Sequence, residues 1–406
     1  MSITYIEGGV CTPAGFSAAG VHCGIRKNRS KRDLALIAAD RDCAAAAVYT
    51  RNLVKGAPLA VTKRNLNDGR ARAVICNSGN ANTCNADGEE KAWQMCEIAA
   101  GLLDIRPEDV IVASTGVIGQ ILPIEPIQSA AADLKAALSP AGGDDAAEAI
   151  LTTDTVKKQG AVEFQAGGKT CRIGAMVKGS GMIHPNMATM LCFVTSDAAI
   201  SSEALQQALT AAVDVTFNMV SIDGDTSTND MVSILASGAA GNAEITPGSE
   251  DLLVFTEALT GLLRDLARKV AGDGEGATHL IECRVTGASS KETARTVAKS
   301  IVCSSLTKAA IFGADANWGR VLCAIGYAGV PVDVTKVDVA FRSAKGTIPV
   351  CKDGAGIPFD EDVAKEILLE KEVGIEVELN SGDFSATAWG CDLTYDYVKI
   401  NGDYRT

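Results

Sequence analysis

The sequence has few of the features that mark nucleic-acid-binding, membrane or secreted proteins. Its 37 lysines and arginines are outnumbered by 50 aspartates and glutamates, which gives a net charge of −13 and a pI near 4.8. Binding to nucleic acid needs clustered cations against the phosphates, so we expect no nucleic-acid partner. No apolar run reaches the roughly 18 residues of a membrane-spanning helix, and the first residues lack a basic start followed by an apolar core. We therefore expect a cytoplasmic protein that does not bind a membrane.

Cysteine and histidine are arranged in neither a disulfide framework nor a metal site. The 13 cysteines are odd in number and include no C-x-x-C pair, which is typical of small buried thiols in a reducing compartment. The histidines are His22, His184 and His279. They lack the spacing of zinc ligands, so a histidine-dependent or metal-dependent hydrolase is poorly supported and no metal is expected. Oxygen-bearing residues alternate over 223–230 as in a calcium loop, but Thr228 and Ile234 stand where an EF-hand requires Gly and Glu.

Small residues dominate the apolar part of the chain. Of the 406 residues, 47% are hydrophobic but only 4% aromatic, and 40 are glycine, which favours closely packed layers in an enzyme-like fold. Alternating strand-like and helix-like periodicities predict a mixed α/β structure. We expect strands at 33–39, 44–50, 73–76, 162–165, 171–177, 191–195, 280–286, 336–341 and 374–379, and helices at 89–103, 126–138, 202–216, 252–270, 292–303 and 362–369.

A glycine-rich loop leads directly into a buried strand. Residues 178–190 read KGSGMIHPNMATM, and the apolar run 191–195 follows at once. Glycine lets other backbone approach closely and Pro185 fixes one φ, so this loop can hold a strained path. If the Thr189 hydroxyl attacks the carbonyl of Ala188, an N-to-O acyl shift and hydrolysis leave Thr189 as a new N-terminus. Its α-amine, with an ordinary pKa of about 8, can then take the hydroxyl proton. From the residues alone, an ordinary turn before a half-buried threonine remains open.

A second stretch offers groups suited to acyl transfer. Residues 109–119 read as a buried strand that runs into Ser114, Thr115 and Gly116. A hydroxyl and a backbone N–H at adjacent positions can stabilise the oxyanion that develops when a carbonyl is attacked. A Thr-Gly pair is also ordinary turn chemistry, and the residues alone do not decide between the two.

Other polar stretches have both structural and functional interpretations. Residues 77–82 (NSGNAN) follow a buried strand and suit a turn, and residues 152–155 (TTDT) suit a helix cap. The glycines of 272–279 (GDGEGATH) follow no strand, so a dinucleotide site is not expected. Glu275 lies in this flexible frame and could press its carboxylate against a ligand amine. The C-terminal residues 391–406 remain patterned to the end, whereas most tails are frayed.

These segments resemble, in order and along nearly the whole chain, those of the ornithine acetyltransferase family, the ArgJ proteins of arginine biosynthesis. Residues 178–190 are similar to the family's self-cleavage segment, in which the chain is cut before the Thr of Met-Ala-Thr-Met. The resemblance implies cleavage between Ala188 and Thr189. The products would be an alpha chain, 1–188, and a beta chain, 189–406, which associate as two copies of each.

The resemblance also implies a fold and exposes three departures from the family pattern. The implied fold is a four-layer αββα sandwich over 1–280 with a smaller C-terminal α/β domain over 281–406, whose tail returns to the active site. His279 stands where the family has Lys, Ala316 where it has Pro, and Gly402 where it has Ala. The exchange at His279 puts in doubt any role of the lysine, whereas Gly402 should not alter the path of the chain.

Particular residues receive roles from the resemblance. Thr189 is implied as the nucleophile and, through its α-amine, as the base, while the Thr115 hydroxyl and the Gly116 amide form the oxyanion hole. Lys178 suits the α-carboxylate of an amino-acid substrate as a point charge, and Glu275 suits the side-chain ammonium of ornithine. The implied substrate contacts are Thr152, Lys178, Thr189, Glu275, Asn401 and Thr406. Residue type alone favours solvated surface charges for Lys178 and Glu275.

The implied activity is the transfer of the acetyl group of N2-acetyl-L-ornithine to L-glutamate through an acetyl ester of Thr189. No cofactor is implied, and acetyl-CoA as a second acetyl donor stays open, as does inhibition by arginine. A related threonine-nucleophile amidase or aminopeptidase would use the same groups with water as acceptor, and hydrolysis of N-acetylornithine without glutamate would distinguish it. A non-catalytic binding module would require no chain cleavage.

Overall fold

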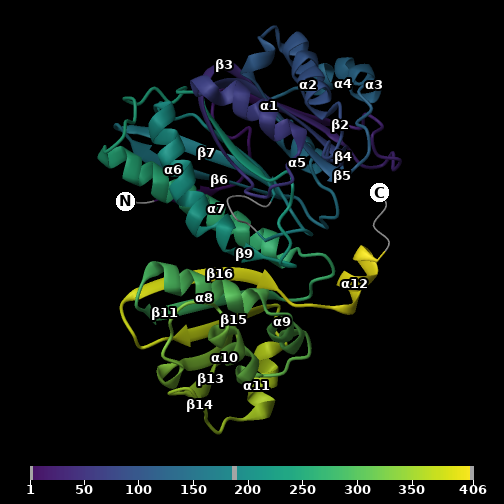
Figure 1. The fold of residues 1–406 in the computed structure, drawn as a ribbon. Helices are drawn as coiled ribbons and strands as arrows, with labels where there is room; N and C mark the ends of the chain where they lie inside the picture. The colour runs from purple at the N-terminus through teal and green to yellow at the C-terminus, as the bar shows by residue number, and fades with distance from the viewer. Residues whose placement is uncertain (1–2, 185–189, 403–406) are drawn as a thin grey trace.

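The computed structural model describes residues 3–184 and 190–402, which form two parts, each built on one β-sheet and its helices (Figure 1). The larger part, at the top of Figure 1, holds a nine-stranded sheet, and the smaller part holds a seven-stranded sheet. The predicted mixed α/β class is confirmed. Pro185, Ala188, Thr189 and Thr406 lie outside the described residues, so the fold does not test the predictions made for them.

The nine-stranded sheet bends into two layers at its longest strand, β3. In order across the sheet the strands are β1 (Thr4–Ile6), β6 (Lys158–Ala166), β7 (Lys169–Lys178), β8 (Leu191–Ser196), β10 (Met231–Ala236), β3 (Leu34–Tyr49), β4 (Arg70–Asn80) and β5 (Val110–Val117), with β2 (Phe16–Val21) paired to β3. The first half of β3 pairs with β2 and β4, and the second half pairs with β10. Between the halves the register with β4 shifts and residues 40–42 are exposed. The prediction of two strands at 33–39 and 44–50 is therefore wrong, because the polar residues between them mark a bend within one strand.

Helices cover both outer faces of the bent sheet, and three hydrophobic cores separate four layers. One outer core lies between the helices α6 (Ser202–Val215) and α7 (Glu250–Gly272) and the strands β6 to β8. The other lies between the helices α1 (Ala57–Asn65), α2 (Gly88–Leu103) and α4 (Ala131–Ala137) and the strands β4 and β5. The middle core joins the two sheet layers, for example through Phe193 of β8 and Ile111 of β5. Neighbouring side chains of one strand enter different cores, as Leu36 and Ile37 do. The predicted αββα arrangement is confirmed.

The helices of the larger part include three short 3₁₀ helices. In chain order, the α-helices and the 3₁₀ helices (η) of the larger part are α1 (Ala57–Asn65), η1 (Leu66–Asp68), α2 (Gly88–Leu103), η2 (Pro107–Asp109), α3 (Glu125–Ser129), α4 (Ala131–Ala137), α5 (Gly143–Ala149), α6 (Ser202–Val215), η3 (Phe217–Met219) and α7 (Glu250–Gly272). The helix predicted at 126–138 is two helices that meet at Ala130. The cap of α6 is Ser201, whose hydroxyl accepts the N–H of Ala204 at 3.3 Å.

The sheet of the smaller part includes one strand whose residues lie within the sequence of the larger part. Its sheet runs β14 (Ala355–Gly356), β13 (Gly346–Lys352), β12 (Asp338–Ser343), β15 (Glu372–Glu378), β11 (Leu280–Ala288), β16 (Phe384–Cys391) and β9 (Val220–Ser221). Its helices are α8 (Lys291–Cys303), α9 (Ser305–Phe312), α10 (Trp318–Gly326), η4 (Val334–Lys336), α11 (Glu361–Leu368) and α12 (Tyr395–Asn401). Strand β9 lies between α6 and α7 in the sequence, and one core runs from Leu266 of α7 to Val285 of β11. The two parts therefore share a hydrophobic core, and a boundary at 280 stays a prediction.

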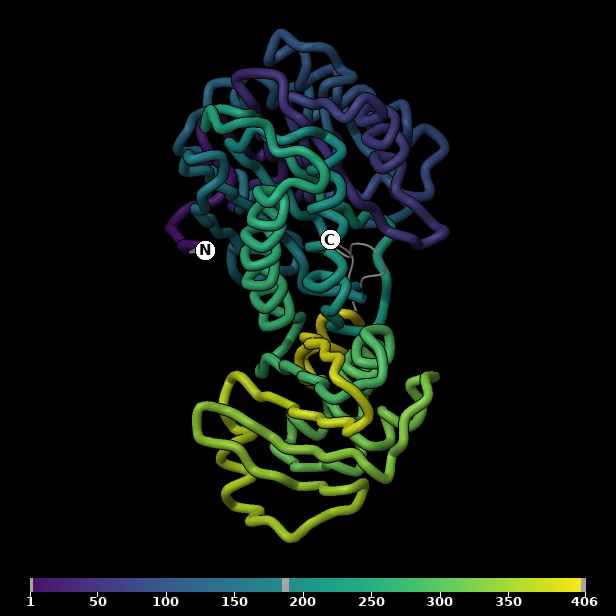
Figure 2. The backbone as a smooth tube through the Cα atoms, turned by 90° about the vertical axis from the view of Figure 1, so that its left-hand side faces the viewer, coloured from purple at the N-terminus to yellow at the C-terminus, as the bar shows by residue number. Residues whose placement is uncertain are grey.

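The described end of the chain returns to the junction of the two parts, where the yellow helix α12 lies (Figure 2). Thr394 caps this helix, and its hydroxyl donates to the carbonyl oxygen of Gly276 at 2.7 Å. Gly276 has φ +69°, and a Cβ there would lie 2.7 Å from the backbone nitrogen of Tyr397, so glycine is required for the close contact. Helix α12 is thereby docked on the glycine-rich loop 272–279. None of the helices described is both long enough and apolar enough to span a bilayer.

Candidate active site

One cavity of about 120 Å³ brings together residues that lie far apart in the sequence. Its lining includes six residues predicted for the site, namely Thr115, Gly116, Thr152, Lys178, Glu275 and Asn401. They come from the ends of β5 and β7, from the loops after α5 and α7, and from the end of α12. Ala188, Thr189 and Thr406 are not among the described residues. The structure thus gathers the six others around one space, while the chemical role of each stays a prediction.

The groups predicted for the oxyanion hole lie at the end of β5. Gly116 pairs with Gly79 of β4 and has φ +131°. A Cβ at this position would lie 2.4 Å from the carbonyl carbon of Gly79, so the position requires glycine. Thr115 Oγ1 accepts a hydrogen bond from Lys178 Nζ at 3.3 Å. Because this oxygen accepts from the lysine, its own hydrogen remains to be donated to a ligand oxygen in the cavity.

Replacing Gly116 with alanine is expected to destabilise the protein by about 3 kcal/mol, because the positive φ and the overpacking against Gly79 each cost about 1–2 kcal/mol. Gly119→Ala, three residues further along the chain, is the matched control, since φ is +79° but no atom lies within 4 Å of the added Cβ. It should cost about 1 kcal/mol. Urea unfolding followed by circular dichroism measures both variants, and equal losses would contradict the close packing of Gly116.

Lys178 supplies the cation of the cavity although its side chain is only 8% exposed. Burial lowers the pKa of Lys178, and the charges of Asp154 and Asp230 oppose that change. Burial also raises the pKa of Asp230 well above its usual range. An ammonium that has lost much of its water interacts strongly with an incoming carboxylate. Asp230 is not among the residues predicted for the site from the sequence.

A buried ion network lies behind the start of the glycine-rich segment. Lys158 Nζ is 2.6 Å from Asp154 Oδ1 and 2.5 Å from Asp273 Oδ2, and the lysine side chain is fully buried. Burial alone would raise the pKa of Asp154, but the charges of the two lysines beside it lower that pKa to about 2. Asp154 Oδ1 also accepts the N–H of Gly179 at 2.7 Å. The network therefore fixes the backbone just after Lys178, and sequence analysis missed it.

Glu275 is held by groups from two separate segments. A Cβ on Gly181 would lie 2.4 Å from the Glu275 carboxylate, so the glycine gives this side chain its place. The N–H of Glu275 donates to the carbonyl oxygen of Ser180 at 2.9 Å. Asn401 Nδ2 donates to Glu275 Oε2 at 2.7 Å, which links the last described helix to the site. This arrangement places a carboxylate on the cavity wall, as the prediction for Glu275 requires.

The polar turn at 223–230 fixes the other end of the glycine-rich segment. Asp223 accepts the N–H groups of Met182 at 2.6 Å and Ile183 at 2.9 Å. The Thr226 hydroxyl donates to the carbonyl oxygen of His184 at 2.7 Å. Asp223 and Thr226, which belong to the stretch compared above with a calcium loop, therefore bind backbone groups of residues 182–184.

Several lining residues of the cavity were not predicted. They are Ala81, Ile118, Thr153, Gly181, Met182, Ser227, Thr228 and Asn229. Asn229 Nδ2 donates to the carbonyl oxygens of Ala81 and Ser114 at 2.5 and 2.9 Å, across 148 and 115 residues of sequence. A contact between such distant segments leaves no local signal in the sequence.

The asparagine-rich stretch 77–82 has a structural role. Within 77–82, the side-chain amides of Asn77, Asn80 and Asn82 donate to Ser114 Oγ and to carbonyl oxygens of the loop after β5 and of α2. These asparagines stabilise turns, and only Ala81 of this stretch lines the cavity.

His279, which replaces the family's lysine, is not among the residues lining the cavity. The His279 ring atom Nδ1 lies 2.9 Å from Asp392 Oδ2, and the backbone N–H of His279 donates to Asp392 Oδ1 at 3.0 Å. Burial alone would raise the pKa of Asp392, but hydrogen bonds from His279 and Thr278 lower it. This pair joins the start of β11 to the end of β16.

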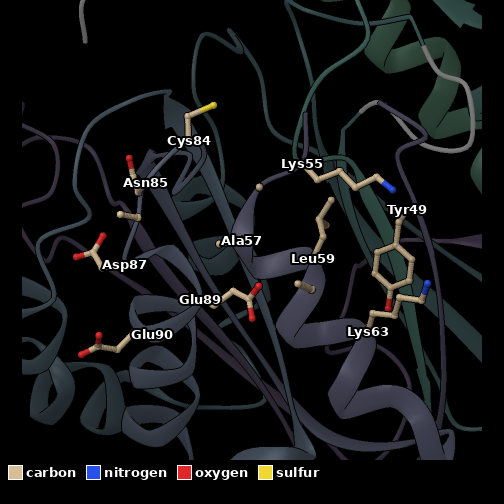
Figure 3. A pocket seen from close by; sticks show the side chains of 13 residues that line it. Tyr49, Lys55, Ala57, Leu59, Lys63, Cys84, Asn85, Asp87, Glu89 and Glu90 are labelled. Atoms are coloured by element: carbon tan, nitrogen blue, oxygen red, sulfur yellow. The ribbon is translucent and has the colours of Figure 1, made fainter. Parts of the chain in front are cut away.

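A larger hollow of about 680 Å³ lies beside α1 and α2 and contains none of the predicted site residues that the structure describes (Figure 3). Asp87, Glu89 and Glu90 occupy one side, and Lys55 and Lys63 occupy the other. Apart from the half-buried Asp87, these charged residues are exposed, as expected of solvated surface groups. The small cavity, with its buried cation and carboxylate, is therefore the better candidate for an active site.

Over residues 17–406 the sequence matches the profile of the ArgJ family. The chain belongs to the ArgJ family. The arginine biosynthesis bifunctional protein ArgJ of Symbiobacterium thermophilum is 53% identical over 404 residues, covering 99% of this chain and 100% of that protein. The protein of the same name from Bacillus subtilis is 48% identical and covers 100% and 98%. The crystal structure of arginine biosynthesis bifunctional protein ArgJ from Bacillus halodurans is similar at 50% identity and a TM-score of 0.50, covering 52% of this chain and 97% of that one. The family predicted from the sequence segments is confirmed.

Proposed function

We propose that the protein is an acetyltransferase of arginine biosynthesis that moves the acetyl group of N2-acetyl-L-ornithine to L-glutamate. The observation that carries the proposal is the convergence of Thr115, Gly116, Lys178 and Glu275 on one small cavity beside the glycine-rich segment. Relatives that match nearly the whole chain are named arginine biosynthesis bifunctional proteins. This family membership does not favour the amidase or aminopeptidase alternative.

Self-cleavage is the first step of the proposed mechanism. Described residues on both sides of the cleavage position are fixed, since Asp223 accepts the N–H of Ile183 at 2.9 Å and the Met190 carbonyl accepts the N–H of Met231 at 2.9 Å. Attack of the Thr189 hydroxyl on the preceding carbonyl gives an ester, and hydrolysis frees the α-amine. The solved Bacillus halodurans chain corresponds to about half of this chain, the length expected of one cleavage product.

Acetyl transfer then follows in two displacements. The freed α-amine takes the proton of the Thr189 hydroxyl, and the oxygen attacks the acetyl carbonyl of N-acetylornithine. The Thr115 hydroxyl and the Gly116 amide stabilise the oxyanion, and the proton passes to the departing amine of ornithine. Glutamate then attacks the acetyl ester with its α-amine, which regenerates the threonine. No cofactor takes part in this scheme.

The two charges of the cavity account for recognition of both substrates. Lys178 binds the α-carboxylate that ornithine and glutamate share, because its buried ammonium faces the cavity beside Thr115. Glu275 binds the side-chain ammonium of ornithine. Thr152 and Asn401 complete the wall, and Thr406 is proposed as a further contact.

We extend the proposal to the bifunctional activity and to the assembly. Acetyl-CoA is proposed as a second donor to glutamate, which would add amino-acid N-acetyltransferase activity. The alpha and beta chains, 1–188 and 189–406, are proposed to associate as two copies of each in the cytoplasm. The core that runs through both parts of the fold supports their association after cleavage, since residues of both chains contribute to it.

The decisive experiment is the intact mass of the purified protein under denaturing conditions, followed by a transfer assay on the same sample. We expect two species that match 1–188 and 189–406, and acetyl transfer from N-acetylornithine and then from acetyl-CoA to glutamate. A single uncut chain without transfer activity would overturn the proposal. Hydrolysis of N-acetylornithine at the same rate without glutamate would instead identify an amidase.

Glu275→Gln is expected to raise the KM for N-acetylornithine by about tenfold to a hundredfold, because a hydrogen bond between charged groups contributes about 1.5–3 kcal/mol. The KM for glutamate should change little, since glutamate carries no side-chain ammonium. Steady-state kinetics with each substrate varied in turn measures the effect. Glu257→Gln, on the exposed face of α7, is the control. Equal changes for both substrates would contradict the assignment of Glu275.

A further inference from the structure

A second hollow of about 630 Å³ lies between the two parts of the fold and is lined from both. We call it the α8 groove, because α8 contributes seven of its lining residues, which are Lys291, Glu292, Arg295, Thr296, Lys299, Ser300 and Cys303. Arg51, which follows β3, and Asp214 of α6 line it from the larger part. A space bounded by two parts of a fold is a common place for ligands.

The α8 groove is positively charged in a protein of net charge −13. Lys291, Arg295 and Lys299 follow one another at intervals of four residues, so they form a basic stripe along one face of α8. Arg51 adds a further cation from the other wall. The carboxylates of the lining are Asp214 and Glu292, which leaves the positive charges in excess.

Asp214, one of the two carboxylates that line the groove, is already paired with an arginine. Arg295 binds Asp214 through both guanidinium arms, at 2.5 and 2.7 Å. Burial is the main cause that lowers the pKa of Lys299 to about 8, while Cys303 opposes this change and the charge of Arg295 adds to it. Lys291 is the first residue of α8, at the positive end of the helix dipole, where a cation is unfavourable unless an anion is near. The four cations of the lining exceed its two carboxylates, so an anion bound in the groove would be stabilised.

The α8 groove adjoins the candidate active site. His184 lines the groove, and Gly181 and Met182, three and two residues earlier, line the small cavity. Because the small cavity has a volume of about 120 Å³, only the acyl end of a longer ligand would enter it. A longer ligand could place its reacting end there and its remaining groups in the neighbouring groove.

We propose that the α8 groove is a binding site for the phosphate groups of an extended ligand. Phosphate is the ligand chemistry that fits, because lysines, arginines and a helix N-terminus all favour a multiply charged anion. The inference rests on the proposed function and deepens its acetyl-CoA part by giving the phosphates a place, since neither N-acetylornithine nor glutamate carries a phosphate. Coenzyme A and inorganic pyrophosphate are suitable probes, because they share this chemistry but differ in length.

Isothermal titration calorimetry of the cleaved protein with each probe tests the proposal. The double variant Arg51→Ala with Lys291→Ala removes two groove cations that the site mechanism does not use. We expect it to weaken binding by at least about tenfold, and binding to the wild type to weaken as salt is raised. Arg70→Ala with Lys345→Ala removes the same charges from exposed positions elsewhere and should bind as the wild type does.

The two probes distinguish the sources of the phosphate. Tighter binding of coenzyme A than of pyrophosphate, lost in the groove variant, supports a carrier that extends toward the active site. Equal binding of both probes, again lost in the groove variant, supports a site for a free phosphate compound. No binding of either probe to the wild type, or unchanged binding in the groove variant, overturns the proposal. Transfer from N-acetylornithine to glutamate, measured on the same samples, reports separately on the proposed function.

Discussion

Thr189→Ala is expected to leave one uncut chain of 41.9 kDa and to reduce acetyl transfer by a factor of about 10⁴ or more, as loss of a catalytic nucleophile does in other enzymes. Both effects have one cause. The same hydroxyl attacks the backbone carbonyl in cleavage and the acetyl carbonyl in transfer, and alanine offers no atom that could form either ester. Intact mass and a transfer assay on one preparation measure the two losses together.

Thr189→Ser is the matched control, because it keeps the hydroxyl and removes only a methyl group. It should still cleave, more slowly, and the cleaved fraction should transfer acetyl groups. A Thr189→Ala protein that cleaves at the same bond would show that another group performs the attack. If it stays uncut but transfers acetyl at the wild-type rate, the covalent acetyl-threonine intermediate would be excluded.

Local patterns predicted most of the secondary structure. The apolar spacing of α7 and the buried runs of β5 and β8 locate these elements to within a few residues, because burial of one face imposes the period of a helix or a strand. The bend of β3 escaped prediction. Its exposed residues 40–42 read as a break between two strands, and only the pairing partners on each side make it one continuous strand.

The candidate site was predictable in its residue types and not in its supporting contacts. Lys178 and Glu275 were recognised because they lie in glycine-rich segments with a family resemblance, and the structure places both on one cavity. Asp273 and Lys158 were not recognised from the sequence, although they form the buried ion pair beside that cavity. Their separation of 115 residues leaves no periodicity or motif in the sequence, so this kind of contact emerges only from the fold.

That buried pair gives the largest stability effect expected for the site. Lys158→Met keeps the length of the side chain and removes its charge, leaving Asp154 and Asp273 buried without their shared cation. Removing one partner from a buried ion network costs about 3–5 kcal/mol. The neighbouring Lys157→Met is the control, because Lys157 forms an exposed pair with Asp144 and exposed pairs contribute about 1 kcal/mol or less. The midpoint of urea unfolding compares the two variants.

The activity of Lys158→Met separates a positioning role from a purely structural one. Asp154 holds the N–H of Gly179, so without Lys158 the backbone after Lys178 should shift and self-cleavage should slow even where the protein remains folded. Adding Asp154→Asn and Asp273→Asn removes the unpaired charges and should restore part of the stability. An asparagine oxygen accepts the Gly179 N–H less strongly than a carboxylate does, so cleavage should recover less than stability. If stability and cleavage recover together, or if Lys158→Met is no less stable than Lys157→Met, the network does not position the cleavage segment.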